Sequence, residues 1–356
     1  MKKRKKAKKR ILIILGTIIL LCITFCISPF GKKLFIHMAG NYIYGKLNVK
    51  EPTKDINTSN NKIQPQNIVE NDDINKKNNS SNIEKNILLI GEEQFDGASN
   101  TDAMIVASLN TKDKTIKLTS LMRDLYVNIP GYRNNKLNSV FSKGGIELLY
   151  ETIGNNFGIN IDGYILVNFK SLEYIVNKLG GIEVTLTKNE ADYLNAKNYI
   201  SNKKYRNVVE GTQTMNGNQV MGYCRIRYVS TGTQNDDFGR TQRQRLVLKS
   251  IYQKIRKMNV LKLTWFMNDI LSNQNIITDI SRTEFNNYFE QLVDLIGHIK
   301  IKEYRVPADG TYENQKVLLG SKKAAVLVPK DWNAIRNDIN NFIYNSKIEQ
   351  DNTSDN

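Results

Sequence analysis

Apolar residues in this chain form short runs and helical stripes that alternate from about residue 83 to residue 343. Short apolar runs bounded by polar turns predict strands, and apolar residues three and four apart predict helices. Strands are expected at 86–91, 103–109, 115–121, 164–169, 181–186 and 303–306, and helices at 144–157, 170–179, 240–258, 281–298 and 332–343. This alternation predicts an α/β fold in which helices flank a mixed central β-sheet.

The N-terminal part of the chain has a different pattern. Residues 1–10 are almost all lysine and arginine, and residues 11–30 are almost entirely apolar. As a helix of about 30 Å, the apolar segment is long enough to cross a bilayer. The basic flank predicts a single-pass anchor in the cell membrane, with a cytoplasmic N-terminus and the rest of the chain outside. A cleaved signal peptide is the alternative, but no small-residue cleavage site follows the apolar run.

Residues 31–82 are predicted to form a juxtamembrane and linker segment. The part at 31–49 is mildly amphipathic and is expected to lie against the outer membrane surface. The part at 52–82 is rich in Asn, Lys, Ser and Asp, and we expect it to tether the folded domain off the membrane. One extracellular domain is expected at 83–345, followed by a flexible tail at 346–356.

Composition argues against several classes of enzyme. The formal net charge is +16, but the first ten residues carry eight positive charges, which leaves only +8 for the rest. Two histidines are too few for a multi-histidine zinc site and argue against a Ser-His-Asp triad. Cys22 and Cys26 lie in the apolar run, so no disulfide framework is available. We interpret the remaining Cys224 as a small core residue.

An arginine-rich stretch at 223–244 carries the candidate chemistry. Arg225 and Arg227 are two residues apart and project from the same side if that piece is extended. Arg240, Arg243 and Gln244 lie on one face of the first turns of the helix expected at 240–258.

The same stretch predicts an anion site at the start of that helix. Asp236 or Asp237 would be its N-cap, and Arg245 would point elsewhere, about 140° away from Arg240. Guanidiniums gathered at a helix N-terminus favour a highly charged anion, phosphate before carboxylate. A solvated basic face with surface salt bridges is the alternative, but the interleaved apolar and tyrosine residues indicate partial burial.

Charged residues also stand next to two of the expected strands. Asp102 precedes the strand at 103–109, and Arg123 and Asp124 follow the strand at 115–121. Ligands of such sheets bind beyond strand ends, where a carboxylate can hold Mg²⁺ and guanidiniums can neutralise a transferring phosphoryl group. A turn residue and a local ion pair explain the same residues. Lys136 is a weaker candidate for the same site.

These pieces, in this order, resemble the LytR-CpsA-Psr family of Gram-positive cell-wall glycopolymer transferases. The matching stretches are ILLIG (87–91), TDAMIV (101–106), SLMRDLYVNIPG (120–131), KLN (136–138), LGGIEV (179–184), RIR (225–227) and DFGRTQRQ (237–244). The resemblance is strong over 86–258 and weak from there to about 344. The family also has a short cytoplasmic end, one anchor and an outside domain.

The resemblance implies a Mg²⁺-dependent phosphotransferase, with Mn²⁺ as the alternative ion. It would move an anionic glycopolymer, either teichoic-acid-like or capsular, from an undecaprenyl-pyrophosphate carrier to a muramic-acid hydroxyl of peptidoglycan. By position, Asp102 matches the metal carboxylate, and Arg123 the essential arginine beside the pyrophosphate. The other pyrophosphate-binding positions match Lys136, Arg225, Arg227, Arg240, Arg243 and Gln244. Residues such as Ile146, Leu149, Phe169, Leu172, Ile175 and Val176 would line a hydrophobic tunnel for the lipid, although core packing explains them equally well.

Two positions depart from the family's pattern. Glu93 stands where the second metal carboxylate is usually an aspartate, and Asn100 replaces an arginine beside Asp102. The general base stays open among Asp102, Glu93 and Asp124. The missing arginine favours a second hypothesis, a membrane-tethered protein that binds an anionic polymer or regulates without turnover. A DNA-binding regulator fits the basic composition but conflicts with the expected extracellular position and has no helix-turn-helix signature.

Overall fold

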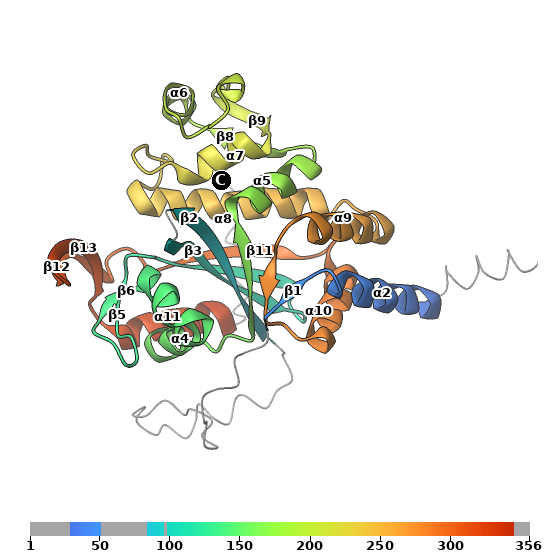
Figure 1. Ribbon diagram of the computed structural model, residues 1–356, viewed down its shortest axis with the longest axis horizontal. Coiled ribbons are helices and arrows are strands. Elements are labelled where there is room, and N and C mark those ends of the chain that lie inside the picture. The colour runs from blue at the N-terminus through green and yellow to red at the C-terminus, as the bar shows by residue number, and fades with distance from the viewer. Residues whose placement is uncertain (1–28, 51–83, 96–97, 345–356) are drawn as a thin grey trace, which may run out of the picture.

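The computed structural model describes residues 29–50, 84–95 and 98–344, and its centre is a seven-stranded sheet (Figure 1). In spatial order its strands are β1 (Asn48–Val49), β10 (Ile277–Thr278), β7 (Gly163–Asn168), β2 (Glu84–Phe95), β3 (Ala98–Asn110), β4 (Thr115–Leu121) and β11 (Lys300–Val306). The sheet contains both parallel pairs, such as β2 with β7, and antiparallel pairs, such as β2 with β3. The predicted mixed sheet is therefore confirmed.

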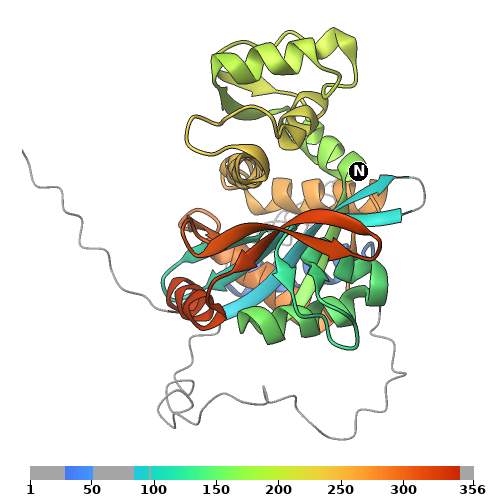
Figure 2. The same cartoon turned by 90° about the vertical axis from the view of Figure 1, so that its left-hand side faces the viewer.

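Helices cover both faces of this sheet. Leu88 and Ile90 of β2 pack in one core with α4 (Val140–Phe157) and α11 (Trp332–Tyr344). Leu89, between them, points to the other face. There it lines a cavity with residues of α5 (Phe169–Lys178) and α8 (Asp236–Ile255), which lie on the opposite side of the sheet in Figure 2.

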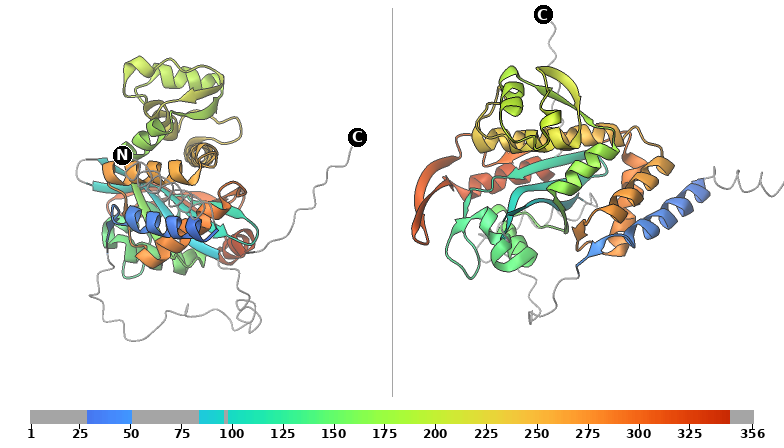
Figure 3. Two further views of the ribbon diagram at one scale, coloured as in Figure 1. Left: turned by 90° about the vertical axis from the view of Figure 1, so that its right-hand side faces the viewer. Right: turned by 45° about the horizontal axis from the view of Figure 1, so that its top comes forward.

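A second core lies beyond α8, away from the sheet (Figure 3). It joins α5 and α8 to β8 (Ile182–Leu186), α6 (Lys188–Ala196), β9 (Gly211–Met215) and α7 (Gly217–Arg225). Strand β8 pairs with β9 in a separate two-stranded sheet, so the strand expected at 181–186 does not extend the central sheet. A Cβ at Gly217 would stand 2.2 Å from the carbonyl oxygen of Glu173. Glycine therefore permits the close approach of α7 to α5.

A third cluster joins the N-terminal helix α2 (Pro29–Tyr44) to α9 (Val260–Asn273) and α10 (Arg282–Leu295). Ile36 and Ile43 of α2 are buried in it, and β1 then pairs with β10 at the edge of the sheet. Residues 31–49 thus belong to the folded domain and are not part of a separate linker. The predicted tether at 52–82 lies outside the described residues, but its neighbours β1 and β2 are strands of one sheet, so it does not join an anchor to a separate domain.

Several predicted N- and C-terminal segments lie outside the described residues. These are the cytoplasmic segment at 1–10, most of the anchor at 11–30 and the tail at 346–356. Among the helices that the structure describes, none combines the length and the apolar character that a membrane crossing needs.

Two hairpins and two short 3-10 helices complete the described elements. The hairpins are β5 (Tyr126–Val127) with β6 (Asn135–Lys136), and β12 (Tyr312–Leu319) with β13 (Lys322–Pro329); the 3-10 helices are η2 (Leu137–Ser139) and η3 (Lys203–Tyr205). The amide of Leu137 donates to the carbonyl of Leu125 at 2.9 Å. This contact holds the end of β6 close to the segment that follows β4.

Candidate active site

The candidate site lies where the end of β4, the first half of β3 and the first turns of α8 meet. Arg123 follows β4 and donates through Nη1 to Asp102 Oδ1 of β3 at 2.7 Å. Through Nε it donates to Asp237 Oδ2 of α8 at 3.0 Å. The sequence had suggested that Asp102 precedes the strand, but it lies within β3. One guanidinium therefore links three elements that are far apart in the sequence.

Asp237 is the centre of this network, a role that the sequence did not indicate. Its carboxylate accepts from Arg123 and from Arg240 Nη2 at 3.1 Å, and it lies 3.5 Å from Arg227 Nε. The predicted cap is wrong, because the N-cap of α8 is Asn235 and Asp237 stands in the first turn. A carboxylate in that turn interacts favourably with the helix dipole while it orients the arginines.

Arg240 is almost completely buried, with 2% of its surface exposed. Its Nη2 donates to the carbonyl oxygen of Asp102 at 3.3 Å, and its Nη1 lies 3.6 Å from the Asp102 carboxylate. Its Nε is also buried and has no hydrogen-bond partner among the described residues. Burial lowers the pKa of Arg240 to about 10, against the raising effect of Asp237. A buried cation with an unused donor favours the binding of an anion.

A polar pocket of about 360 Å³ opens beside Arg240. Arg225, Arg227 and Arg240 line it together with Asp102 and Gln244. Residues 225–227 do not form an extended strand, because Arg225 is the last residue of α7 and Ile226 and Arg227 lie in the loop that follows. Both arginines nevertheless reach the same pocket, so the structure brings together most of the predicted pyrophosphate-binding residues.

An apolar cavity of about 310 Å³ adjoins the polar pocket. Phe169, Cys224 and Gln244 line both spaces. The Phe169 ring centre lies 4.6 Å from the guanidinium carbon of Arg225, in a cation–π contact. Beyond these residues the cavity continues between the sheet and helices α5, α8 and α9, with aliphatic and aromatic walls. A charged pocket therefore lies directly beside an apolar one.

Half of the residues expected to line a lipid tunnel do line this cavity, namely Phe169, Leu172 and Ile175. Ile146 and Leu149 instead belong to α4, on the opposite face of the sheet. Val176 is fully buried in the second core. The periodicity of a helix identifies its apolar face but not the neighbour that the face meets, which explains these differences.

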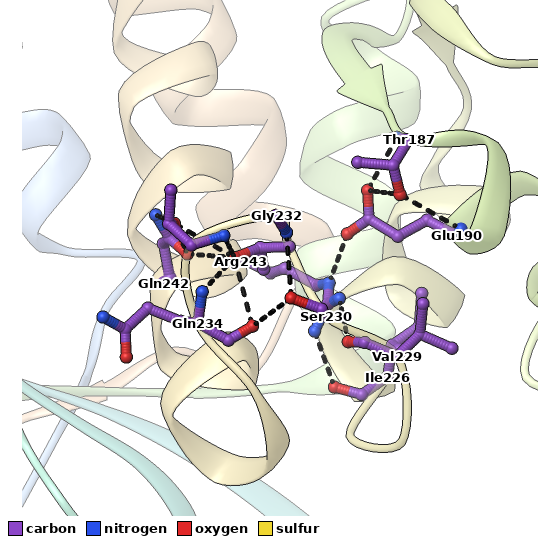
Figure 4. A network of polar contacts seen from close by, with 11 residues as sticks. Thr187, Glu190, Ile226, Val229, Ser230, Gly232, Gln234, Gln242 and Arg243 are labelled. Atoms are coloured by element: carbon purple, nitrogen blue, oxygen red, sulfur yellow. Dashed lines mark hydrogen bonds and ion pairs between the residues drawn. The ribbon is translucent and has the colours of Figure 1, made fainter.

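Arg243 faces away from the polar pocket, so its predicted role in binding the pyrophosphate is wrong. It is 0% exposed, and its Nε donates to Glu190 Oε1 at 2.8 Å (Figure 4). Its Nη1 and Nη2 donate to the carbonyl oxygens of Ile226 at 3.2 Å and Val229 at 2.7 Å. Glu190 is held in turn by a capping box with Thr187 at the start of α6. Arg243 therefore ties α8 to α6 and to the loop after α7.

Two further basic residues are paired with acidic partners and do not line the polar pocket. Arg245 points away from Arg240, as expected, and its Nε lies 3.2 Å from Glu303 Oε2 on β11. Lys136 Nζ lies 2.7 Å from Asp124 Oδ1. Lys136 therefore reaches the neighbourhood of Arg123 only through Asp124.

The described residues contain no group of three His, Cys, Asp or Glu side chains that would hold a metal ion by themselves. Asp102 offers one carboxylate, which it shares with Arg123. Glu93 pairs with Asn100 across β2 and β3, but its side chain lies outside the described part. Mg²⁺ usually binds one or two carboxylates together with substrate phosphate oxygens. The donors present therefore fit Mg²⁺ as an ion shared with a phosphate-bearing ligand.

Comparison with protein families identifies the chain. The LytR_cpsA_psr family matches residues 43–331. The chain belongs to the LytR-CpsA-Psr family. The match begins inside α2 and ends at the residue before α11, so nearly the whole described body falls within the family region.

Curated relatives within the LytR-CpsA-Psr family include a named transferase and a named regulator. The polyisoprenyl-teichoic acid–peptidoglycan teichoic acid transferase TagU of Enterococcus faecalis is 33% identical over 202 residues, 55% of this chain and 58% of the relative. The regulatory protein MsrR of Staphylococcus aureus is 33% identical over 172 residues, 48% of each chain. The chain thus spans about half the length of the curated relatives it matches.

Solved structures of similar proteins share the fold. Protein gbs0355 from Streptococcus agalactiae has a TM-score of 0.58 at 27% identity, covering 75% of this chain and 90% of its own. The LytR-CPS2A-psr family protein YwtF (TagT), with bound octaprenyl pyrophosphate lipid, has a TM-score of 0.53 at 23% identity, covering 73% and 90%. The second likeness supports the fold alone.

Proposed function

We propose that this protein transfers an anionic glycopolymer, teichoic-acid-like or capsular, from an undecaprenyl-pyrophosphate carrier to peptidoglycan. The observation that carries the proposal is the junction of the polar pocket with the apolar cavity at Phe169, Cys224 and Gln244. A lipid diphosphate has the same two parts in the same order, a charged head and an apolar tail. The name of the enterococcal relative supports the proposal.

The reaction is an attack of a muramic-acid hydroxyl on the sugar-linked phosphorus of the carrier. A new P–O bond forms while the bridging P–O bond of the pyrophosphate breaks, and polyprenyl phosphate leaves. The hydroxyl proton passes to a carboxylate of the site, such as Asp102 or Asp237. Guanidiniums placed around the pyrophosphate offset the charge that develops on it, and such preorganised donors are the main source of catalysis in phosphoryl transfer.

The ion pairs of the site prepare the arginines for this ligand. Asp102 and Asp237 hold Arg123 and Arg240 in a fixed fork, with Arg227 nearby. A diphosphate entering the polar pocket meets Arg240, which is already oriented and desolvated, and Arg227, so less reorganisation is needed on binding.

The proposal includes a divalent cation and a cell-surface location. Mg²⁺, with Mn²⁺ as the alternative, would be held by Asp102 and Glu93, and when bound it supplies positive charge to phosphate oxygens. The basic and apolar segments at 1–30 favour a single-pass protein of the cell membrane with an extracellular domain. Peptidoglycan and the lipid-linked polymer are then both accessible to the site.

A second candidate function is the binding of a lipid-linked or free anionic polymer without turnover. It is favoured by the pairing of Asp102 with two guanidiniums, which already occupy its carboxylate. The relative named as a regulatory protein is consistent with it.

A transfer assay with the full chain separates the two functions. The chain is incubated with a lipid-pyrophosphate-linked saccharide and peptidoglycan, with Mg²⁺ and with EDTA. We expect transfer with Mg²⁺, and a loss of about 10²–10³-fold in rate for Arg123→Ala because a donor to the developing charge is removed. Arg133→Ala, an exposed arginine in the turn between β5 and β6, is the matched control and should retain full activity.

Tight binding of the lipid-linked saccharide without transfer, under conditions in which TagU turns over, would support the binding function. Full transfer by Arg123→Ala would remove the proposed role of Arg123 in the transfer reaction.

A further inference from the structure

The helix α2 exposes an apolar row on its outer side. Leu34, Met38 and Tyr42 are spaced four residues apart and therefore lie along one face of the helix. All three are exposed, Met38 to 62%, and the neighbouring Phe35 is exposed as well. The opposite side of α2 is already buried in the third core. The exposed row is thus a second apolar face that intramolecular packing does not use.

A second apolar pair stands on α9, which packs against α2. Leu261 and Trp265 are four residues apart, and they are 67% and 66% exposed. Helices α2 and α9 lie at the same end of the molecule in Figure 1. Large exposed apolar residues that cluster in this way mark an interaction surface.

The apolar cavity reaches this end of the molecule. Its wall includes Phe266, Met267 and Ile270 of α9, whereas the exposed Trp265 does not line it. The inner side of α9 therefore borders the cavity, while its outer side carries the exposed apolar pair.

Charge and chain position identify the surface that would cover this face. Residues 29–50 contain Lys32, Lys33, Lys46 and Lys50 and no acidic residue. The apolar segment expected to be a membrane anchor directly precedes α2 in the sequence. Basic segments next to a membrane span are attracted to anionic lipids, and tryptophan is enriched at the level of the headgroups.

We infer that the exposed rows of α2 and α9 dock the folded domain onto the surface of an anionic phospholipid bilayer. The inference rests on the proposed function in one respect: the tail end of the apolar cavity then lies next to the lipid from which the carrier comes. The carrier's chain can pass from the bilayer into the cavity along α9, without crossing water.

Fluorescence of the two tryptophans tests the docking independently of any transfer. Trp332→Phe leaves Trp265 as the only tryptophan, and Trp265→Phe leaves Trp332, whose ring packs 5.3 Å from that of Phe157 in the first core. Each full-length variant is reconstituted into anionic vesicles that contain lipids brominated on the acyl chains. Because quenching by bromine needs near contact, we expect Trp265 to lose most of its emission and Trp332 to lose little.

Equal and weak quenching of both tryptophans would overturn the inference, as would failure of the full chain to float with the vesicles. A second copy of the chain is the other possible occupant of the face. It would be revealed by a doubled mass in light scattering that Met38→Glu reverts, together with an unquenched Trp265, and this result would also overturn the inference.

Substitutions on the face separate lipid docking from catalysis. Leu261→Glu should lower transfer from a long-chain carrier embedded in vesicles, and should leave transfer from a short-chain, water-soluble carrier unchanged. Leu318→Glu is the matched control, because Leu318 is also 67% exposed but lies on β12, far along the sequence from α2 and α9. Equal loss in the two variants contradicts docking, whereas no transfer by the unsubstituted chain with either carrier contradicts the proposed function alone.

Discussion

Two arginines on α8 show opposite uses of the same side chain. Arg243 has each of its three donor nitrogens on an oxygen of the protein, one on Glu190 and two on carbonyl groups. Arg240 lies less than one helical turn away and pairs with Asp102, which also pairs with Arg123. Its buried Nε has no hydrogen-bond partner among the described residues. Only Arg240 lines the polar pocket.

The difference teaches that burial alone does not mark a ligand-binding arginine. Both side chains are almost fully buried, so exposure does not distinguish them. What differs is whether the protein itself satisfies the guanidinium. A satisfied guanidinium holds elements together, and an unsatisfied one beside a pocket favours an anion.

The largest expected effect is the loss of stability when Arg243, whose donors are all satisfied by the protein, is removed. Arg243→Ala leaves Glu190 as a buried carboxylate without its partner, which costs about 3–5 kcal/mol of unfolding free energy. Urea denaturation of the purified chain measures this loss. The double substitution Arg243→Met with Glu190→Leu removes both charges and should recover most of it. An unchanged midpoint for Arg243→Ala would contradict the structural role.

The next effect concerns Cys224, whose thiol lies near both arginines. Burial raises the pKa of Cys224 to about 12, against the lowering effect of Arg243 and Arg225. Only the thiolate reacts, so alkylation at about pH 8 should be about 10³-fold slower than for an exposed cysteine. The rate should rise about tenfold for each unit of pH, because the thiolate fraction rises with pH below the pKa.

Mass spectrometry after iodoacetamide treatment measures the alkylation, in a chain with Cys22→Ser and Cys26→Ser. The urea-denatured chain is the control and should react at the ordinary rate of a cysteine. Rapid reaction of the folded chain would show that water reaches the junction of the two pockets. The contrast between the buried Arg243 and the pocket-lining Arg240 would then be weaker.

The smallest effect concerns Arg240, the arginine that lines the polar pocket. Arg240→Ala should weaken binding or transfer of a polyprenyl diphosphate by about 10²-fold, because one preorganised donor is lost. Stability should fall by only about 1 kcal/mol. Asp102 keeps Arg123 as a partner, and Asp237 keeps Arg123 and Arg227, so no carboxylate is left unpaired.

Thermal unfolding and titration with a fluorescent prenyl diphosphate measure the two quantities for Arg240→Ala. Arg240→Lys keeps the charge but loses the planar fork, and its affinity should be intermediate. A loss of stability as large as that of Arg243→Ala would place both arginines in the same structural class.

Much of the fold could be predicted because its strands are short apolar runs between clear turns. The strand expected at 115–121 has the bounds of β4, and the helix expected at 332–343 differs from α11 by one residue. Helix α7 was missed because it has only nine residues and contains two glycines, which disfavour a helix. The capping box of Asn216 with Gln219 was the available signal.

The site could be predicted in part, because clustered arginines and strand-end carboxylates are visible in the sequence. The roles of Arg243 and Asp237 could not, because each depends on a partner from another element. Glu190 is 53 residues before Arg243, and Asp237 meets Arg123 across 114 residues. Sequence spacing shows which face of a helix an arginine occupies, but not whether a distant carboxylate already occupies its donors.

The position of β1 has a consequence for the segment at 51–83. Both neighbours of this segment, β1 and β2, are strands of the same sheet, so the segment starts and finishes on one body. Its length therefore does not set the position of the polar pocket relative to α2. An epitope or protease site inserted there would lengthen the connection between β1 and β2 and leave the arrangement of α2 and the polar pocket unaltered.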